Sequence, residues 1–145
     1  MNSGMVKKPL KLVLDTNILV SALIYGGKPE QVYNLILEKQ ITAITSTILF
    51  SELFEVLIKK FNFDPRRVKQ LERIIKKHFK VVYPNETINA VKDDDDNRVL
   101  EAAKEGKCEY IITGDKELLK IRKYKHIKIV TAEEFLNEIS SNLTS

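Results

Sequence analysis

The stretch Leu10-Lys-Leu-Val-Leu14-Asp15 decides the fold. A short apolar run that ends at an acidic residue is typical of a strand buried inside a sheet. A helical segment is expected to follow at 17–24, and Gly26-Gly27 ends it. A buried strand that leads directly into a helix predicts the first βα unit of a parallel sheet.

The same alternation continues to the end of the chain. Further strands are predicted at 41–45, 80–83, 110–113 and 127–130, each followed by apolar residues at helical spacing. This pattern predicts an α/β fold with a central, mainly parallel, five-stranded sheet flanked by helices. The predicted organisation is an N-terminal extension at 1–9, a single domain at 10–139 and a frayed tail at 140–145.

Composition excludes several classes of protein and site. The 145 residues are 43% hydrophobic and 30% charged, which is the balance of a globular domain. The single cysteine, Cys108, excludes an intrachain disulfide and a zinc site built from cysteines. No segment is apolar for long enough to span a bilayer and no signal peptide is visible, so we expect a cytoplasmic protein with no membrane partner.

Basic residues are concentrated in one block. Residues 55–82 contain nine Lys/Arg and three Asp/Glu, in a chain whose net charge is +4. A basic block beside acidic clusters suits a protein that binds a polyanion and a cation together. A solvated helix face explains the block equally well.

Four acidic residues lie where α/β folds bind ligands. Asp15 and Asp115 follow the carboxyl ends of predicted strands, Asp96 lies at a helix start, and Glu52 lies beside the apolar stripe of another helix. Singly, each could be a helix cap, a turn residue or a surface residue. Gathered in one pocket, their charges would repel and call for a hard cation such as Mg²⁺ or Mn²⁺. Because such sites promote phosphodiester cleavage, the pattern predicts a nuclease.

Four motifs occur in order around these acids: Leu12-Val-Leu-Asp15-Thr16-Asn17, Ser46-x5-Glu52-Leu53, Asp95-Asp96-Asn97-Arg-Val-Leu-Glu-Ala-Ala103 and Ile112-Thr113-Gly114-Asp115-Lys-Glu-Leu118. Together they resemble the four motifs of the PIN-domain nucleases, and most closely the VapC-like toxins of type II toxin–antitoxin pairs. The resemblance covers roughly residues 10–136, nearly the whole chain.

The resemblance implies roles for individual residues. The catalytic Mg²⁺ or Mn²⁺ would be bound by the acids Asp15, Glu52, Asp96 and Asp115. Asn17 and Thr113 match positions that support the site by hydrogen bonding. The run Asp93–Asp96 departs from the pattern, since relatives often have proline at its second place. The family's spacing favours Asp96 as the ligand over its neighbour Asp95.

The resemblance also implies a substrate and partners. The expected reaction is endonucleolytic cleavage of RNA, and single-stranded or looped RNA is the expected substrate because A-form helices hide their base edges. The RNA backbone would lie on basic residues of the block, namely Lys59, Lys60, Arg66, Arg67 and Lys69. A cognate antitoxin and a homodimer are the expected partners. Four phenylalanines would form either the dimer surface or core: Phe50, Phe54, Phe61 and Phe63.

Two alternatives belong to other classes. An aspartate-based phosphotransfer domain also places aspartates at strand ends, but the phosphatase type requires Asp-x-Asp where this chain has Asp15-Thr-Asn17. A non-catalytic RNA-binding module with the PIN fold would have a degenerate site. The presence of all four acids argues against degeneration.

Overall fold

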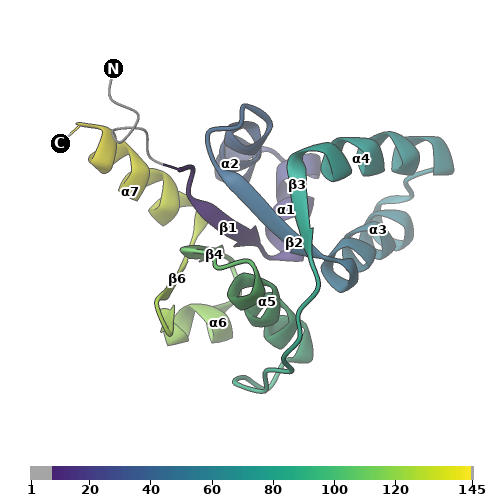
Figure 1. The fold of residues 1–145 in the computed structure, drawn as a ribbon. Helices are drawn as coiled ribbons and strands as arrows, with labels where there is room; N and C mark the ends of the chain where they lie inside the picture. The colour runs from purple at the N-terminus through teal and green to yellow at the C-terminus, as the bar shows by residue number, and fades with distance from the viewer. Residues whose placement is uncertain (1–7, 145) are drawn as a thin grey trace.

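A computed structural model describes residues 8–144 (Figure 1). Residues 1–7 of the expected N-terminal extension, and Ser145, lie outside the described residues. The elements, in chain order, are β1 (Lys11–Leu14), α1 (Thr16–Ile24), α2 (Gly27–Leu37), β2 (Thr42–Ser46), α3 (Thr47–Phe61), α4 (Pro65–His78), β3 (Phe79–Val82), α5 (Asp94–Glu105), β4 (Tyr110–Ile112), α6 (Lys116–Ile121), β5 (Lys123–Tyr124), β6 (Ile127–Val130) and α7 (Ala132–Thr144).

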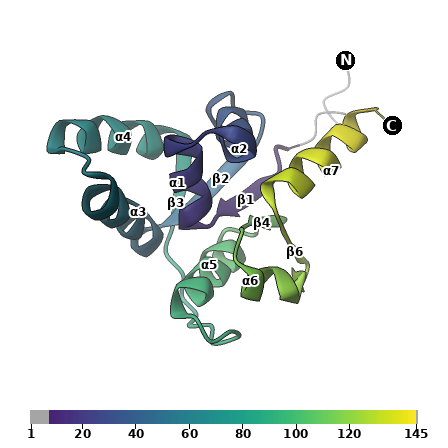
Figure 2. The same ribbon diagram turned by 180° about the vertical axis from the view of Figure 1, so that it is seen from behind.

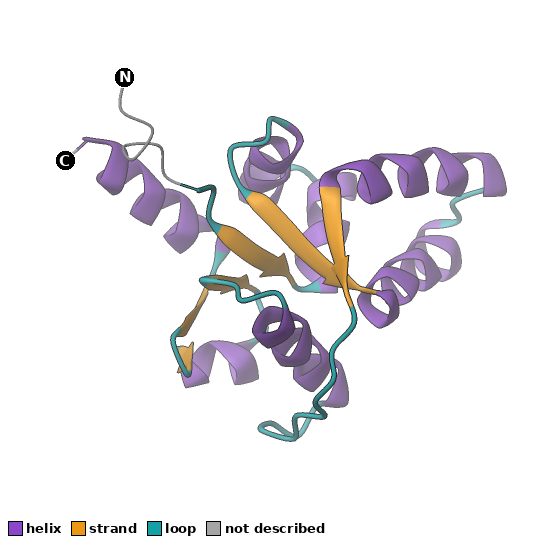
Figure 3. Ribbon diagram, in the orientation of Figure 1, coloured by secondary structure: helices purple, strands orange, loops and turns teal. Residues whose placement is uncertain are grey.

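The strands form one sheet in the order β3-β2-β1-β4-β6-β5. Every neighbouring pair is parallel except β5 with β6. The predicted α/β fold with a mainly parallel, helix-flanked sheet is therefore confirmed (Figure 3). The predicted count of five strands was wrong, because β5 adds a sixth at the edge. Its two residues, Lys123 and Tyr124, are too few to show an alternating pattern.

The sheet is covered on both faces, as its apolar strands require. Leu12 and Leu14 of β1 pack into a larger core with α1, α2, α4, α7 and most of α3. Val13, which points the opposite way, packs into a second core with α5 and α6. Figures 1 and 2 show α5 and α6 together on one side of the sheet. β1 thus contributes side chains to the cores on both faces of the sheet.

Helix starts follow the capping residues of the sequence. Ser46 accepts from Leu49 N at 3.3 Å, and Asp64 accepts from Arg67 N at 2.8 Å, with Pro65 in the first turn. α5 begins at Asp94, two residues before the helix start predicted at Asp96, because Asp93 caps it. At the other end of the chain α7 continues to Thr144, so the boundary drawn at residue 140 falls within a helix.

The four phenylalanines belong with the larger core. Phe54 and Phe63 are buried there, and Phe50 and Phe61 pack partly buried against it. Among the residues whose burial is described, the exposed large apolar side chains are others: Tyr25, Ile48, Ile58, Ile74 and Tyr83. Within residues 8–144, no helix combines the length and the apolar character that a membrane span needs.

Gly106 closes α5 tightly against the sheet. A Cβ added there would lie 2.7 Å from Cγ2 of Ile44, which is itself buried in the second core. Gly106→Ala is therefore expected to lower the free energy of unfolding by about 1–3 kcal/mol, the usual range for overpacking. Urea denaturation measures it. Gly114→Ala is the matched control, because its Cβ would meet Ile18 at an ordinary 3.8 Å. Equal stability of the two variants would contradict the prediction.

Candidate functional site

The sheet order places two strand ends side by side at the centre. From β1 the chain continues through β2 to β3 in one direction, and β4 and β6 lie on the other side of β1. The order therefore reverses between β1 and β4, and open α/β sheets bind ligands at such a switch point. Asp15 follows β1 directly, and Asp115 lies three residues beyond the end of β4.

Thr113 links these two aspartates. Its hydroxyl donates to Oδ2 of Asp15 at 2.8 Å and accepts from the backbone N–H of Asp115 at 3.0 Å. Thr113 is fully buried and Asp15 is only 8% exposed. The Asp115 carboxylate also caps α6, because its Oδ1 accepts from Glu117 N at 2.8 Å. A single hydroxyl group thus fixes the positions of Asp15 and Asp115 relative to each other.

Asp96 brings a third acid to the same place from the first turn of α5. Carboxylate oxygens of Asp93, Asp96 and Asp115, one from each, lie within 4.8 Å of one another. Asp96 is 4% exposed, and among the described residues its Oδ2 has no hydrogen-bond partner. A buried, ionised oxygen without a partner is costly, so this atom requires a proton or a cation.

The electrostatics of the cluster follow from burial and mutual repulsion. Burial raises the pKa of Asp96 to about 7, helped by the negative charges of Asp115, Asp93 and Asp15. A protonated Asp96 can also share its proton with Asp115. The pKa of Asp15 is raised by burial as well, although the Thr113 hydroxyl opposes the shift. Perturbed acids that gather in this way are typical of functional sites.

Glu52 faces the cluster from α3 and is half-buried. Burial raises its pKa, the Thr16 side chain lowers it, and the charges of Asp95, Asp15 and Asp93 raise it further. Glu52 also lines a cleft of about 390 Å³ along α3. All four acids singled out from the sequence therefore lie at one end of the sheet: Asp15, Asp96 and Asp115 perturb one another, and Glu52 is close enough to feel the charge of Asp15.

The other predicted site residues divide into two groups. Thr113 contacts Asp15 as described, whereas the Asn17 side chain is exposed. Asp93 and Asp95 are both exposed, but the Asp93 carboxylate lies beside those of Asp96 and Asp115, whereas Asp95 lines the α3 cleft. Sequence reasoning missed Asp93. The available signal was its place at the start of the aspartate run, where a helix cap is expected.

The five basic residues predicted to bind RNA lie in two separate places. Lys59 and Lys60 line the α3 cleft together with Glu52 and Asp95. Lys59 forms an exposed 2.9 Å ion pair with Glu55. Arg66, Arg67 and Lys69 lie in the first turns of α4, at the far end of the α3–α4 hairpin (Figure 1), where the Arg67 guanidinium stacks on Phe63 at 3.8 Å. Of the five basic residues predicted to bind RNA, only Lys59 and Lys60 line the cleft that Glu52 also lines.

The donor set fits a hard divalent cation. It consists of carboxylate oxygens, the ligands that Mg²⁺ and Mn²⁺ prefer over nitrogen or sulfur. The unpartnered Oδ2 of Asp96 points to the same need for positive charge. The cluster can therefore hold a cation near a cleft that is lined by Lys59 and Lys60.

Comparison with known proteins agrees with this geometry. A family model described as PIN domain matches residues 11–117. The uncharacterized protein MJ1680 of Methanocaldococcus jannaschii is 34% identical over 147 residues, which cover 92% of this chain and 94% of that protein.

Two solved structures share the fold. VapBC2 from Rickettsia felis, bound to a DNA fragment from its promoter, aligns with a TM-score of 0.54 at 13% identity, over 83% of this chain and 97% of that one. PAE2754 from Pyrobaculum aerophilum aligns with a TM-score of 0.55 at 16% identity, over 92% and 91%.

Proposed function

Because the chain belongs to the PIN-domain family, we propose that it is a Mg²⁺- or Mn²⁺-dependent endoribonuclease that hydrolyses RNA phosphodiester bonds. The observation that supports this best is the buried Asp96 carboxylate beside Asp93 and Asp115, one oxygen of which has no partner among the described residues. A cation supplies the positive charge that such a cluster of ionised acids requires.

The proposed cation-binding acids are Asp15, Glu52, Asp96 and Asp115, to which we add Asp93. When bound, a divalent cation neutralises charge on the phosphodiester and lowers the pKa of water. Thr113 keeps Asp15 oriented through the 2.8 Å hydrogen bond. Glu52 is placed at the cleft, and its raised pKa suits it to accept a proton from the attacking water.

The α3 cleft is the proposed path of the RNA. Lys59 and Lys60 lie about 10–12 Å from Glu52 along the helix axis, at 1.5 Å of rise per residue. They can bind phosphates upstream or downstream of the scissile bond, while the acids act on the bond itself. Arg66, Arg67 and Lys69 would contact a longer RNA that extends past the cleft.

Replacing both cleft lysines is expected to weaken binding without removing the chemistry. In Lys59→Gln/Lys60→Gln the salt dependence of RNA affinity should flatten by about one unit of slope for each phosphate that the protein no longer neutralises. Single-turnover cleavage of bound RNA should persist. The matched control is Lys39→Gln/Lys77→Gln. It removes two lysines beside the start of β2, at the end of the strands opposite to the acids. If both pairs weaken binding equally, the cleft is not the RNA path.

Two protein partners belong to the proposal. A cognate antitoxin is suggested by the motif resemblance and by the fold shared with VapBC2. A homodimer would bury some of the exposed apolar side chains, of which Tyr25 and Ile58 lie near the C-terminal ends of α1 and α3. Light scattering is expected to give twice the chain mass of 16.7 kDa. A monomer at high micromolar concentration would rule out the dimer.

The reaction is tested by incubating the purified protein with a short single-stranded RNA and with DNA of the same sequence, in Mn²⁺ or in EDTA. Internal cuts in the RNA that require Mn²⁺ are expected. Retention of the RNA in a gel shift without cleavage would instead support a non-catalytic RNA-binding module. Stable transfer of phosphate onto the protein from a phosphodonor would support the phosphotransfer alternative.

A further inference from the structure

Side chains on one face of α5 form hydrogen bonds with the backbone of the loop between β3 and α5, from one end of that loop to the other. The loop is the teal segment that runs from β3 to α5 in Figure 3. Three side chains spaced four residues apart on α5, and so on one face, accept from its backbone N–H groups. Asn97 accepts from Ala90 N and Val91 N, Glu101 from Ile88 N, and Glu105 from Asn85 N.

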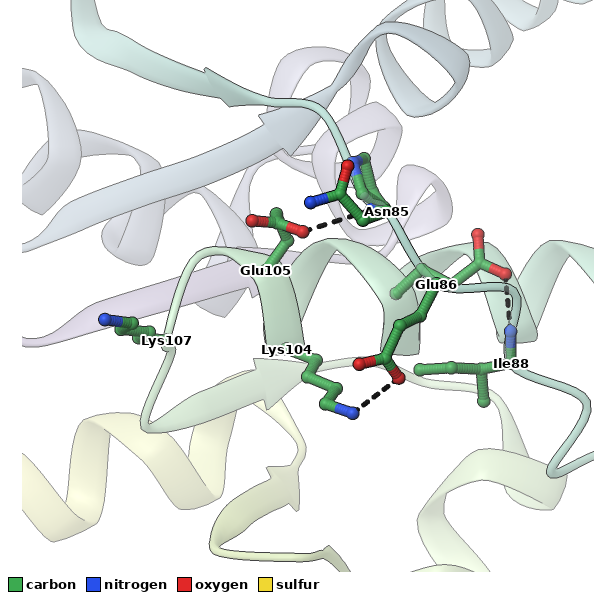
Figure 4. A pocket seen from close by; sticks show the side chains of 8 residues that line it. Asn85, Glu86, Ile88, Lys104, Glu105 and Lys107 are labelled. Carbon is green, nitrogen blue, oxygen red and sulfur yellow. Dashed lines mark hydrogen bonds and ion pairs between the residues drawn. The ribbon is translucent and has the colours of Figure 1, made fainter.

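Figure 4 shows the contacts between this loop and the C-terminal end of α5. Glu105 accepts from Asn85 N at 3.1 Å, and Lys104 pairs with Glu86 at 2.6 Å. Glu105 and Glu86 are exposed. These contacts hold the far end of the loop, roughly two helical turns from the first turn of α5 that carries Asp96.

The Asn97 contact differs from the other two because it closes the segment that carries two acids. Asn97 is 1% exposed, and its Oδ1 accepts at 3.0 and 3.1 Å while its Nδ2 donates to Val91 O at 2.9 Å. These three bonds tie residues 90 and 91 to residue 97. Asp93 and Asp96 both lie within the closed segment.

The closed segment sets where Asp93 can lie. Asp96 is fixed by α5, whereas Asp93 precedes the helix and belongs to the loop. Asp93 caps the helix by accepting from Asp95 N at 2.8 Å, and its carboxylate still lies within 4.8 Å of those of Asp96 and Asp115. An amide is suited to this position, since it satisfies the loop backbone without adding charge to a crowded acidic site.

We propose that Asn97 is a positioning residue that holds Asp93 in the divalent-cation site. This proposal rests on the proposed function, because it takes the acids to be cation ligands. The Asn97 amide is engaged by the loop backbone and would not be a ligand of the cation. It acts through the loop backbone, as residues behind metal ligands commonly do.

A purely structural role for Asn97 makes a different prediction. If the amide only stabilises the loop, its loss lowers the melting temperature and leaves cation affinity unchanged. If it positions Asp93, its loss weakens cation binding, and the effect vanishes once Asp93 is no longer a ligand. A double-mutant cycle in Mn²⁺ affinity separates the two roles.

The experiment measures free Mn²⁺ by electron paramagnetic resonance in titrations of four proteins: the parent, Asn97→Ala, Asp93→Asn and the double variant. Asparagine caps helices as well as aspartate does, so Asp93→Asn keeps the start of α5. We expect Asn97→Ala to weaken Mn²⁺ binding by about tenfold. The double variant should bind no more weakly than Asp93→Asn. Glu105→Ala, which removes the exposed hydrogen bond to Asn85 N, should bind Mn²⁺ as tightly as the parent does.

Parent-like Mn²⁺ affinity in Asn97→Ala overturns the proposal, as does a further tenfold loss in the double variant. If Asn97→Ala does not fold, Asn97→Ser takes its place, and failure of both to fold assigns Asn97 to general stability and overturns the proposal. No Mn²⁺ binding by the parent would instead remove the proposed function, and the positioning role with it.

Discussion

Asp96→Asn is expected to lower the rate of RNA cleavage by at least about 100-fold. Loss of a residue that only supports a metal ligand lowers activity by about 10- to 100-fold, and loss of a ligand itself should cost at least as much. Asparagine keeps the shape of the side chain but removes the charge that would bind the cation. The fold should be preserved, because burial already favours the neutral form of Asp96, whose pKa is raised to about 7. RNA affinity should persist or rise, since one negative charge near the phosphates is gone.

Two neighbours serve as controls for Asp96→Asn. Asp94→Asn removes the same charge from the same turn of α5, but Asp94 is exposed and outside the acidic cluster, so parent-like cleavage is expected. Asp95→Asn should lower the rate by less than about tenfold, because Asp95 lines the cleft rather than the cluster. Single-turnover kinetics in Mn²⁺ measure all three. A larger reduction in Asp95→Asn than in Asp96→Asn would reverse the choice between them.

The metal-free protein is expected to lose stability as the pH rises from about 4 to 7. The pKa of Asp96 is raised from 3.8 to about 7 in the folded state, so the folded state holds this proton more tightly than the unfolded chain does. The resulting stability is complete below pH 3.8 and disappears as the pH passes 7. The raised pKa values of Asp15 and Glu52 act in the same direction. The slope approaches about 1.4 kcal/mol per pH unit for one group, or roughly 4–5 °C in melting temperature.

Mn²⁺ should reverse this destabilisation, because it replaces the proton as the neutralising charge and stabilises only the folded state. Thermal denaturation across this pH range, with EDTA or with Mn²⁺, tests both statements. Asp96→Asn should show a flatter pH dependence and a smaller gain from Mn²⁺. The comparison with this variant cancels the other groups that titrate in the same window. A slope identical to that of the parent would show that Asp96 is not the titrating group.

The sheet and the positions of the main acids could be predicted because their signals are local. The apolar run before Asp15 and the one before Gly114-Asp115 mark buried strands, and acids at the ends of parallel strands must meet at one edge. Helix caps such as Asp64 are equally local, since capping depends on a few neighbouring residues. The edge strand β5 has no such signal, because its pairing depends on where β6 lies in the sheet.

The remainder of the site depends on contacts between distant residues. In a run of four aspartates, spacing alone does not show that Asp93 turns back toward Asp115 while Asp95 faces the cleft. The hydrogen bonds of Asn97 depend on the course of the preceding loop, which has no secondary structure. The α3 cleft likewise arises where the start of α5 faces α3, and this separates Lys59 from Arg66 within a single basic block.

Calorimetric titration of Mn²⁺ into the metal-free protein at about pH 8 tests most directly whether these acids form a divalent-cation site. At that pH the Asp96 carboxyl is ionised, since its pKa is about 7. Saturable binding is expected in the parent, with strong weakening in Asp96→Asn and parent-like binding in Asp94→Asn. Absence of binding in the parent, or equal binding in the parent and Asp96→Asn, would contradict the assignment of the site.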